Sequence, residues 1–141
     1  MSKAIQMVKE WHAKFGVPVL DQPGFPGKER ADLRRNLINE EAEEFETASL
    51  NGDVVEAADA LADLLYVVYG AALEWGIPID AVFAEVHRSN MSKVWPDGSV
   101  HYREDGKVLK PSTYSPADIG PILSTANASH TAIAPSPEAN Q

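Results

Sequence analysis

The sequence has no cysteine among its 141 residues, which excludes a disulfide framework and any metal site built from thiolates. It also has no apolar run with the length and purity of a membrane span. Its first 15 residues mix charged and apolar side chains in an amphipathic pattern that is unlike a signal peptide. We therefore expect a protein of the cytoplasm, or of the host cytoplasm if the chain is viral, with no membrane partner.

Basic residues are scarce. The 12 lysines and arginines stand against 21 aspartates and glutamates, which gives a formal net charge of -9. An acidic surface repels a phosphate backbone, so we expect no nucleic-acid polymer as a partner. The same charge does not exclude a small phosphorylated substrate that binds together with a metal ion. The length suits one domain with a sizeable core.

Apolar periodicity and helix stop signals predict four helices joined by short connections. Their expected ranges are 3–15, 31–50, 54–75 and 81–93, and the second could start earlier, at Glu29. Asp53 is the expected N-cap of the third helix, with Glu56 completing a capping box. This pattern predicts an all-α fold that resembles a four-helix bundle.

The chain changes character after Lys93. Two Asp-Gly turns flank short alternating segments, which predicts a small β-hairpin that pairs 100–103 with 107–109. From residue 123 onward Ser, Thr, Ala and Pro dominate, which is typical of a disordered tail. The expected organisation is one domain over residues 1–122, followed by a disordered tail over 123–141.

Two aspartates interrupt the most apolar segment of the chain. The stretch Ala57–Leu73, AADALADLLYVVYGAAL, has Asp59 and Asp63 as its only charged residues. We expect such a helix to be buried over most of its circumference, where an ionised carboxylate is costly unless it is paired or binds a metal. Residues at i and i+4 share one helical face, so the pair predicts a divalent cation. The alternative is neutralisation by a nearby base, for which the candidates are Arg34, Arg35 and Lys93.

A second acidic cluster lies in the preceding helix, in the segment LINEEAEEF. Glu40 and Glu44 stack at i and i+4, and Glu41 lies about 60° from Glu44 around the helix axis. Carboxylates that converge in this way suit a hard cation such as Mg²⁺ or Mn²⁺. The alternative for this cluster is a solvated acidic face.

The pattern EExxE in one helix, followed by an aspartate in LADLLYVV of the next, resembles the all-α nucleoside triphosphate pyrophosphohydrolases. That superfamily includes MazG, the phosphoribosyl-ATP pyrophosphohydrolases and the dimeric dUTPases. The resemblance covers about residues 33–93. The residues that match its motifs are Glu40, Glu41, Glu44 and Asp63.

This chain departs from the usual second motif of the superfamily, which is ExxD. The residue three positions before Asp63 is Ala60, and an acid occurs four positions before it, at Asp59. A literal ExxD is formed by Glu56 and Asp59, which makes Glu56 a reserve ligand. The departure leaves open how many metal ions bind and which acid takes the fourth carboxylate role.

The resemblance implies a MazG fold and a Mg²⁺-dependent enzyme, for which Mn²⁺ can substitute. The implied reaction cleaves a (d)NTP between its α and β phosphates into the monophosphate and pyrophosphate. Glu41, Glu44 and Asp63 are the expected metal ligands, Asp59 an additional ligand, and Glu40 the general base or a ligand of a second metal. The segments SNMSK and DGK…KP are similar to a MazG-like branch with phage members of the MazZ type, which act on dGTP; dGTP is therefore one candidate substrate.

The β and γ phosphates also need cations, for which the candidates are Lys93, Lys107 and Lys110. Asn90 is a candidate for a hydrogen bond to the sugar or base. The alternative for each lysine is an ordinary surface cation, and the alternative for Asn90 is a polar group at the end of a helix.

The third helix has more apolar surface than a small bundle can cover, so we expect a homodimer or homotetramer. The residues expected at that interface are Tyr66, Val67, Tyr69 and Leu73. A competing hypothesis is a non-catalytic helical oligomeric adaptor with an acidic docking face. A di-iron bundle ranks last, because it needs Glu-x-x-His pairs and the acidic clusters contain no histidine.

Overall fold

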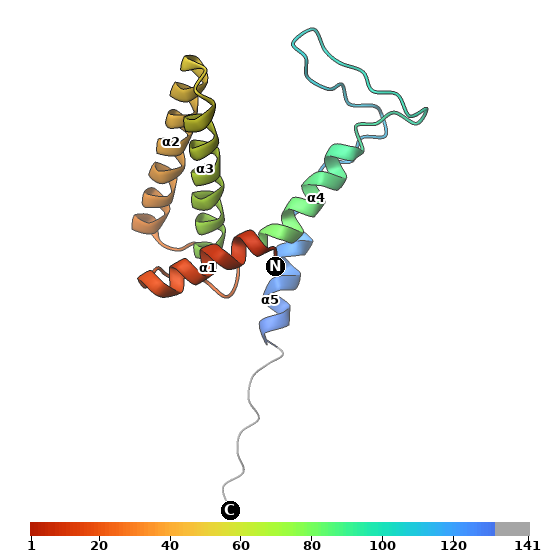
Figure 1. Cartoon of the computed structure of the whole chain (residues 1–141). Helices are drawn as coiled ribbons and strands as arrows, with labels where there is room; N and C mark the ends of the chain where they lie inside the picture. The colour runs from red at the N-terminus through yellow and green to blue at the C-terminus, as the bar shows by residue number, and fades with distance from the viewer. Residues whose placement is uncertain (132–141) are drawn as a thin grey trace, which may run out of the picture. The chain divides into compact units, whose positions relative to one another are not determined.

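The computed structural model describes residues 1–131, which divide into two compact units at the bond between Pro78 and Ile79. The described residues form five helices and no strand, so the prediction of an all-α fold is confirmed (Figure 1). The helices are α1 (Lys3–Phe15), α2 (Lys28–Asn51), α3 (Val54–Glu74), α4 (Ile79–Met91) and α5 (Gly120–Thr131). The extent of the domain, expected to be 1–122, stays a prediction.

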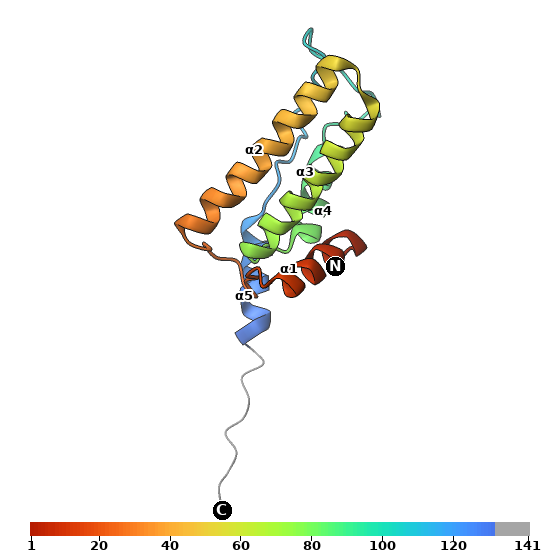
Figure 2. The ribbon, with the colours of Figure 1, turned by 60° about the vertical axis from the view of Figure 1, so that its left-hand side comes forward.

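Helices α2 and α3 form an antiparallel hairpin, which both ribbon views show side by side (Figures 1 and 2). Gly52 ends α2 with φ 68°, a left-handed conformation that glycine adopts without a steric penalty. The carboxylate of Asp53 then accepts hydrogen bonds from the backbone N–H groups of Val55 and Glu56, so Asp53 is the N-cap of α3, as expected. The backbone N–H of Asp53 donates to the carbonyl of Ala48, so this hydrogen bond replaces the predicted capping box.

Helix α1 packs on α3 through Ile5 and Val8, both of which are buried. The loop that follows α1 is fixed to the C-terminal end of α3, because the backbone N–H of Leu20 donates to the carbonyl of Leu73 at 3.0 Å. Gly76 allows this close approach: a Cβ there would lie 2.1 Å from the carbonyl oxygen of Gln22. The first unit is therefore a helical hairpin with α1 and its loop held against α3.

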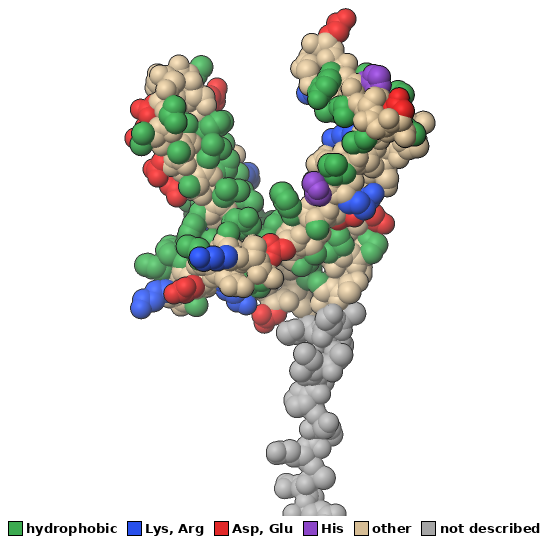
Figure 3. Space-filling model, turned by 45° about the vertical axis from the view of Figure 1, so that its right-hand side comes forward, with side chains coloured by type: hydrophobic (Ala, Val, Ile, Leu, Met, Phe, Trp, Pro, Cys, Tyr) green, Lys and Arg blue, Asp and Glu red, His purple; other side chains and the backbone are tan. Residues whose placement is uncertain are grey.

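The expectation that α3 is buried over most of its circumference is wrong for the single chain, because α1 and α2 cover only part of it. Leu61, Leu65 and Tyr66 are 44%, 58% and 37% exposed. Asp59 and Asp63, expected in a dry environment, are exposed as well. In Figure 3 hydrophobic side chains are visible over much of this unit. Leu73 is buried in the chain's own core, so it is not free to contact a partner as predicted.

The second unit contains α4, a long irregular segment and α5. The predicted hairpin is not formed as two strands; the segment has a single antiparallel bridge between Tyr102 and Val108. The prediction of a disordered tail is wrong for 123–131, which belong to α5. Pro121 lies in the first turn of this helix, where a missing N–H costs little, and Ile122 and Leu123 are half-buried. Residues 132–141 of the predicted tail lie outside the described residues.

No single helix within residues 1–131 combines the length and the apolar composition that crossing a membrane requires; only α3 and α4 taken together, as an interrupted pair, reach both.

Candidate active site

The carboxylate of Glu41 is at the centre of the acidic cluster. The Oε2 atom of this half-buried residue is fully buried and has no hydrogen-bond partner within residues 1–131. Burial raises the pKa of Glu41, and the negative charges of Glu44, Asp63, Glu40 and Asp59 raise it further. All five acids of the predicted site are thus electrostatic neighbours across the α2–α3 hairpin, while their individual roles stay predictions.

The other four acids of this cluster are exposed. In the described part of the chain, no three acidic or histidine side chains already converge as the ligands of a metal ion would. Carboxylates that share a site repel one another unless a cation lies between them. The backbone therefore brings the acids to one region of the hairpin without drawing them into a coordination shell.

The sequence left open whether an arginine neutralises Asp59 and Asp63, and the structure shows that neither Arg34 nor Arg35 does so. Arg34 pairs with Glu74, and Arg35 pairs with Asp32. Lys93, the third candidate, donates to the side-chain oxygen of Asn90 at 2.7 Å. Within the first unit no lysine or arginine forms an ion pair with Glu41, Asp59 or Asp63, so the unit's own bases do not compensate their charge.

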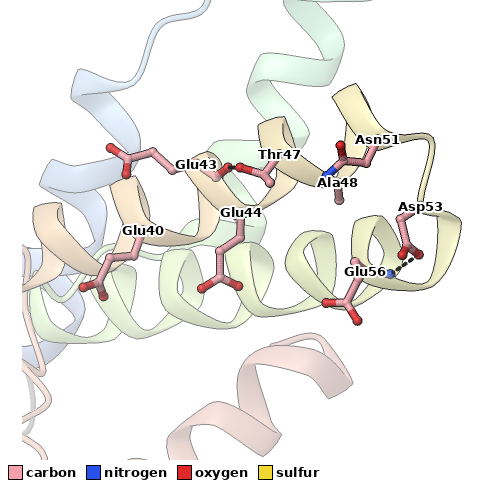
Figure 4. Close-up of a pocket in the computed structure, with 8 residues that line it drawn as sticks. All are labelled: Glu40, Glu43, Glu44, Thr47, Ala48, Asn51, Asp53 and Glu56. Atoms are coloured by element: carbon pink, nitrogen blue, oxygen red, sulfur yellow. Dashed lines mark hydrogen bonds between the residues drawn. The ribbon is translucent and has the colours of Figure 1, made fainter.

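A groove of about 610 Å³ lies beside the cluster (Figure 4). Its lining residues, most of them acidic, are Glu40, Glu43, Glu44, Thr47, Ala48, Asn51, Asp53 and Glu56. In Figure 4 the side chains of Glu40 and Glu44 extend from α2 toward α3, whereas Glu43 points away. The groove shares Glu40 and Glu44 with the cluster, but Glu41, Asp59 and Asp63 do not line it, so it adjoins the cluster and does not enclose it. Glu56, the reserve ligand, lines it.

All four predicted substrate-binding residues belong to the second unit, and three of them, Asn90, Lys93 and Lys110, gather there. Lys93 donates to Asn90, and the ammonium of Lys110 lies 4.3 Å from the ring centroid of Tyr114. A hydrogen bond from Ser89 lowers the pKa of Tyr114; burial opposes this shift, and the charges of Lys110 and Lys93 reinforce it. Lys107 lies beyond this group, in an exposed turn where its backbone N–H donates to Asp105. Tyr114 was missed from sequence, because nothing in the spacing of a lone tyrosine marks it.

A buried ionic network at the far end of the hairpin was also missed. The side chain of Glu74 is 0% exposed and accepts hydrogen bonds from Arg30 and Arg34 at 2.5–2.8 Å. Arg34 in turn lies 3.1 Å from Nε2 of His12. Because all charges are paired or hydrogen-bonded, this network holds α1, α2 and α3 together and leaves no free ligand.

An α2–α3 hairpin with EExxE on one helix and an aspartate of LADLLYVV on the next defines a MazG-like pyrophosphohydrolase. The family model for phosphoribosyl-ATP pyrophosphohydrolase matches residues 8–90, more than half of the chain, and the chain belongs to that family. A search of curated proteins gave no match. The family is one of nucleotide pyrophosphohydrolases, so the activity class is hydrolysis of a phosphoanhydride.

Proposed function

We propose that this chain is a divalent-metal-dependent hydrolase that converts a (d)NTP, with dGTP among the candidates, to the nucleoside monophosphate and pyrophosphate. The observation that carries the proposal is the buried Oε2 atom of Glu41, which lies among four further carboxylates and has no hydrogen-bond partner in the described part of the chain. Membership of a pyrophosphohydrolase family supports the reaction class. The competing adaptor hypothesis explains exposed acids, but it gives no reason for a carboxylate oxygen buried without a partner.

The residues around Glu41 fit Mg²⁺, and Mn²⁺ as its substitute, because both cations prefer oxygen ligands. Glu41, Glu44 and Asp63 would hold the ion, and Asp59 would be an additional ligand. A bound divalent ion supplies charge stabilisation for the phosphate oxygens and lowers the pKa of coordinated water.

The remaining chemistry falls to the chain's own side chains. Glu40 is exposed beside Glu41 and Glu44, and we assign it the role of general base that accepts the proton of the attacking water; ligation of a second metal is its alternative role. Lys93, Lys107 and Lys110 are assigned to the β and γ phosphates, and Asn90 to the sugar or base. An acid-lined groove repels a free triphosphate, so the neutralising cations determine whether substrate binds.

The active form is proposed to be a homodimer or homotetramer. The support is the apolar face of α3, where Leu61, Leu65 and Tyr66 remain exposed in the single chain.

The test is a panel of canonical and modified (d)NTPs together with phosphoribosyl-ATP, each incubated with Mg²⁺ while pyrophosphate and phosphate are measured separately. We expect pyrophosphate release, and a loss of about 100-fold or more in Glu41→Gln. Glu46→Gln is the matched control, because Glu46 is exposed on the same helix and outside the cluster.

Release of single phosphates alone would contradict the assigned cleavage position. An absence of hydrolysis, together with a melting temperature that Mg²⁺ does not raise, would favour the adaptor.

A further inference from the structure

Residues 110–118 form a strap that is fixed along α4. The backbone N–H of Ser115 donates to the hydroxyl of Ser92 at 2.9 Å, and Arg88 donates to the carbonyl of Pro116 at 3.0 Å. The backbone N–H of Asp118 donates to Glu85 at 2.9 Å. The pKa of Glu85 is lowered to about 2 by its hydrogen bonds from Arg88 and from this N–H. The strap is thus anchored through polar contacts from both its middle and its end.

The anchored strap positions Tyr114 against α4. The backbone N–H of Tyr114 closes a turn on the carbonyl of Pro111, which is buried. The hydroxyl of Ser89, on α4, donates to the phenol oxygen in a long hydrogen bond of 3.4 Å. Because Ser89 donates, the phenol proton of Tyr114 is free to donate to a further group.

Two lysines act on this phenol, and neither forms an ion pair with an acid in the described part of the chain. Lys110 lies over the Tyr114 ring, and Lys93 is near enough to lower the pKa of the phenol. Within residues 1–131 neither lysine pairs with a carboxylate: Lys93 donates to Asn90, and Lys110 contacts the aromatic ring. In a chain with 21 acids and 12 bases, two neighbouring lysines that lack an acidic partner mark a place for an external anion.

The geometry of these groups favours a phosphate anion. Ammonium groups bind phosphate as point charges, and a phenol adds a directed hydrogen bond to one of its oxygens. Two cations that both act on one phenol match the charge of linked phosphates better than that of a single carboxylate.

We propose that Tyr114, with Lys93 and Lys110, forms a polyphosphate subsite within the second unit, in which the phenol donates a hydrogen bond to a phosphate oxygen. The proposed function enters this inference only in naming a nucleotide as the source of the polyphosphate. Tyr114 is a binding residue in this scheme, and Ser89 and the strap are positioning elements.

The test measures binding of inorganic triphosphate to the full chain by calorimetry without divalent metal, so that chemistry is not involved. We expect Tyr114→Phe to weaken binding by about 5- to 10-fold and Lys110→Met by about 10- to 100-fold. Lys110→Arg should restore most of the affinity. Lys9→Met, which removes an exposed lysine from α1, is the control and should bind as the wild type does.

Unchanged affinity in Tyr114→Phe, or an equal loss in Lys9→Met, would overturn the subsite. Circular dichroism establishes that each variant is folded, and a KM for nucleotide that rises in Tyr114→Phe while kcat is kept would support the binding role. Triphosphate binding that follows this pattern in a chain that hydrolyses no nucleotide would refute the proposed function alone. Hydrolysis with no effect of any of these substitutions on KM or on triphosphate binding would refute the subsite alone.

Discussion

At the residue scale, two carboxyl groups of the first unit have opposite electrostatic environments. Burial alone would raise the pKa of Glu74, but hydrogen bonds and charge from Arg30 and Arg34 outweigh it, and the pKa is lowered. Among the residues that the structure describes, the buried Oε2 atom of Glu41 has no hydrogen-bond partner, and the pKa of Glu41 is raised. The arginines therefore make Glu74 a stable structural anion, whereas no arginine or lysine of the first unit pairs with Glu41.

His12 makes the stability of this unit depend on pH. Burial lowers its pKa; the carbonyl of Pro18 opposes that shift, and Arg34 adds to it. The unfolded chain therefore binds more protons than the folded chain between the lowered pKa and 6.5, and stability falls as the pH falls through this window. We expect the free energy of unfolding, from urea titrations between pH 7.5 and 5.5, to decline more in the wild type than in His12→Gln.

The comparison with His12→Gln isolates the contribution of the imidazole, because Glu41 is present in both proteins. The raised pKa of Glu41 has the opposite effect, since it stabilises the fold as the pH falls. Equal slopes in the two proteins would show that the pKa of His12 is the same in the folded and the unfolded chain. The lowered pKa of Glu74 acts in a separate window, since its contribution is present above 4.5 and is lost below it.

The sequence predicted some of these residues and not others, for a physical reason. Asp59 and Asp63 are conspicuous because no other charge occurs in their segment, and Glu41 belongs to a motif. Glu74 lies one residue past that segment, and its partners are 40 and 44 positions away. Contacts over such a distance depend on how the helices cross, which residue spacing does not determine.

At the element scale, Gly70 on α3 leaves space for the buried side chain of Arg34 on α2. A Cβ on Gly70 would lie 2.6 Å from Nη1 of Arg34 and 3.1 Å from Nε2 of His12. Arg34 cannot move aside freely, because it is buried and paired with Glu74. Gly70 therefore leaves space for the guanidinium of Arg34, although a glycine within a helix lowers the stability of that helix.

We expect Gly70→Ala to destabilise the fold by about 1–3 kcal/mol, since overpacking costs more than the helix propensity that alanine adds. Chemical denaturation of both proteins at pH 7.5 measures this difference. Ala71→Gly, the neighbouring position in the same helix, is the control for propensity alone and should lose about 1 kcal/mol. A Gly70→Ala variant that is more stable than the wild type would mean that Arg34 is not held as described.

A helix was predictable where capping signals and apolar periodicity agreed. This holds for α1 and α3, which begin at the predicted residues Lys3 and Val54. The prediction failed for α5, where small polar residues suggested disorder although Ile122 and Leu123 are half-buried. The Asp-Gly turns were correctly seen as turns, but one bridge formed in place of two strands. Local signals predict where the chain turns, whereas packing decides whether a short segment is ordered.

At the scale of the whole molecule, the first unit has an apolar face that its own helices leave exposed to solvent. Trp11 stacks on Phe15 with ring centroids 4.6 Å apart and meets the edge of Tyr66 at 6.3 Å. All three are partly exposed, and Leu65 on α3 is exposed as well. Aromatic and aliphatic groups exposed together favour burial against a second copy, which agrees with the proposed homodimer or homotetramer.

This proposal predicts that Leu65→Glu converts the oligomer to a monomer, because the substitution places a charge on the face that the second copy would cover. Size-exclusion chromatography with light scattering, at several protein concentrations, measures the mass directly. Leu50→Glu is the matched control: Leu50 is 82% exposed at the end of α2, so the same charge change there should leave the mass unchanged. Helicity should be kept in both variants, since neither side chain is buried in the single chain. A wild-type chain that is monomeric at high concentration would contradict the proposal, and the exposed face of α3 would then be a property of the free protein.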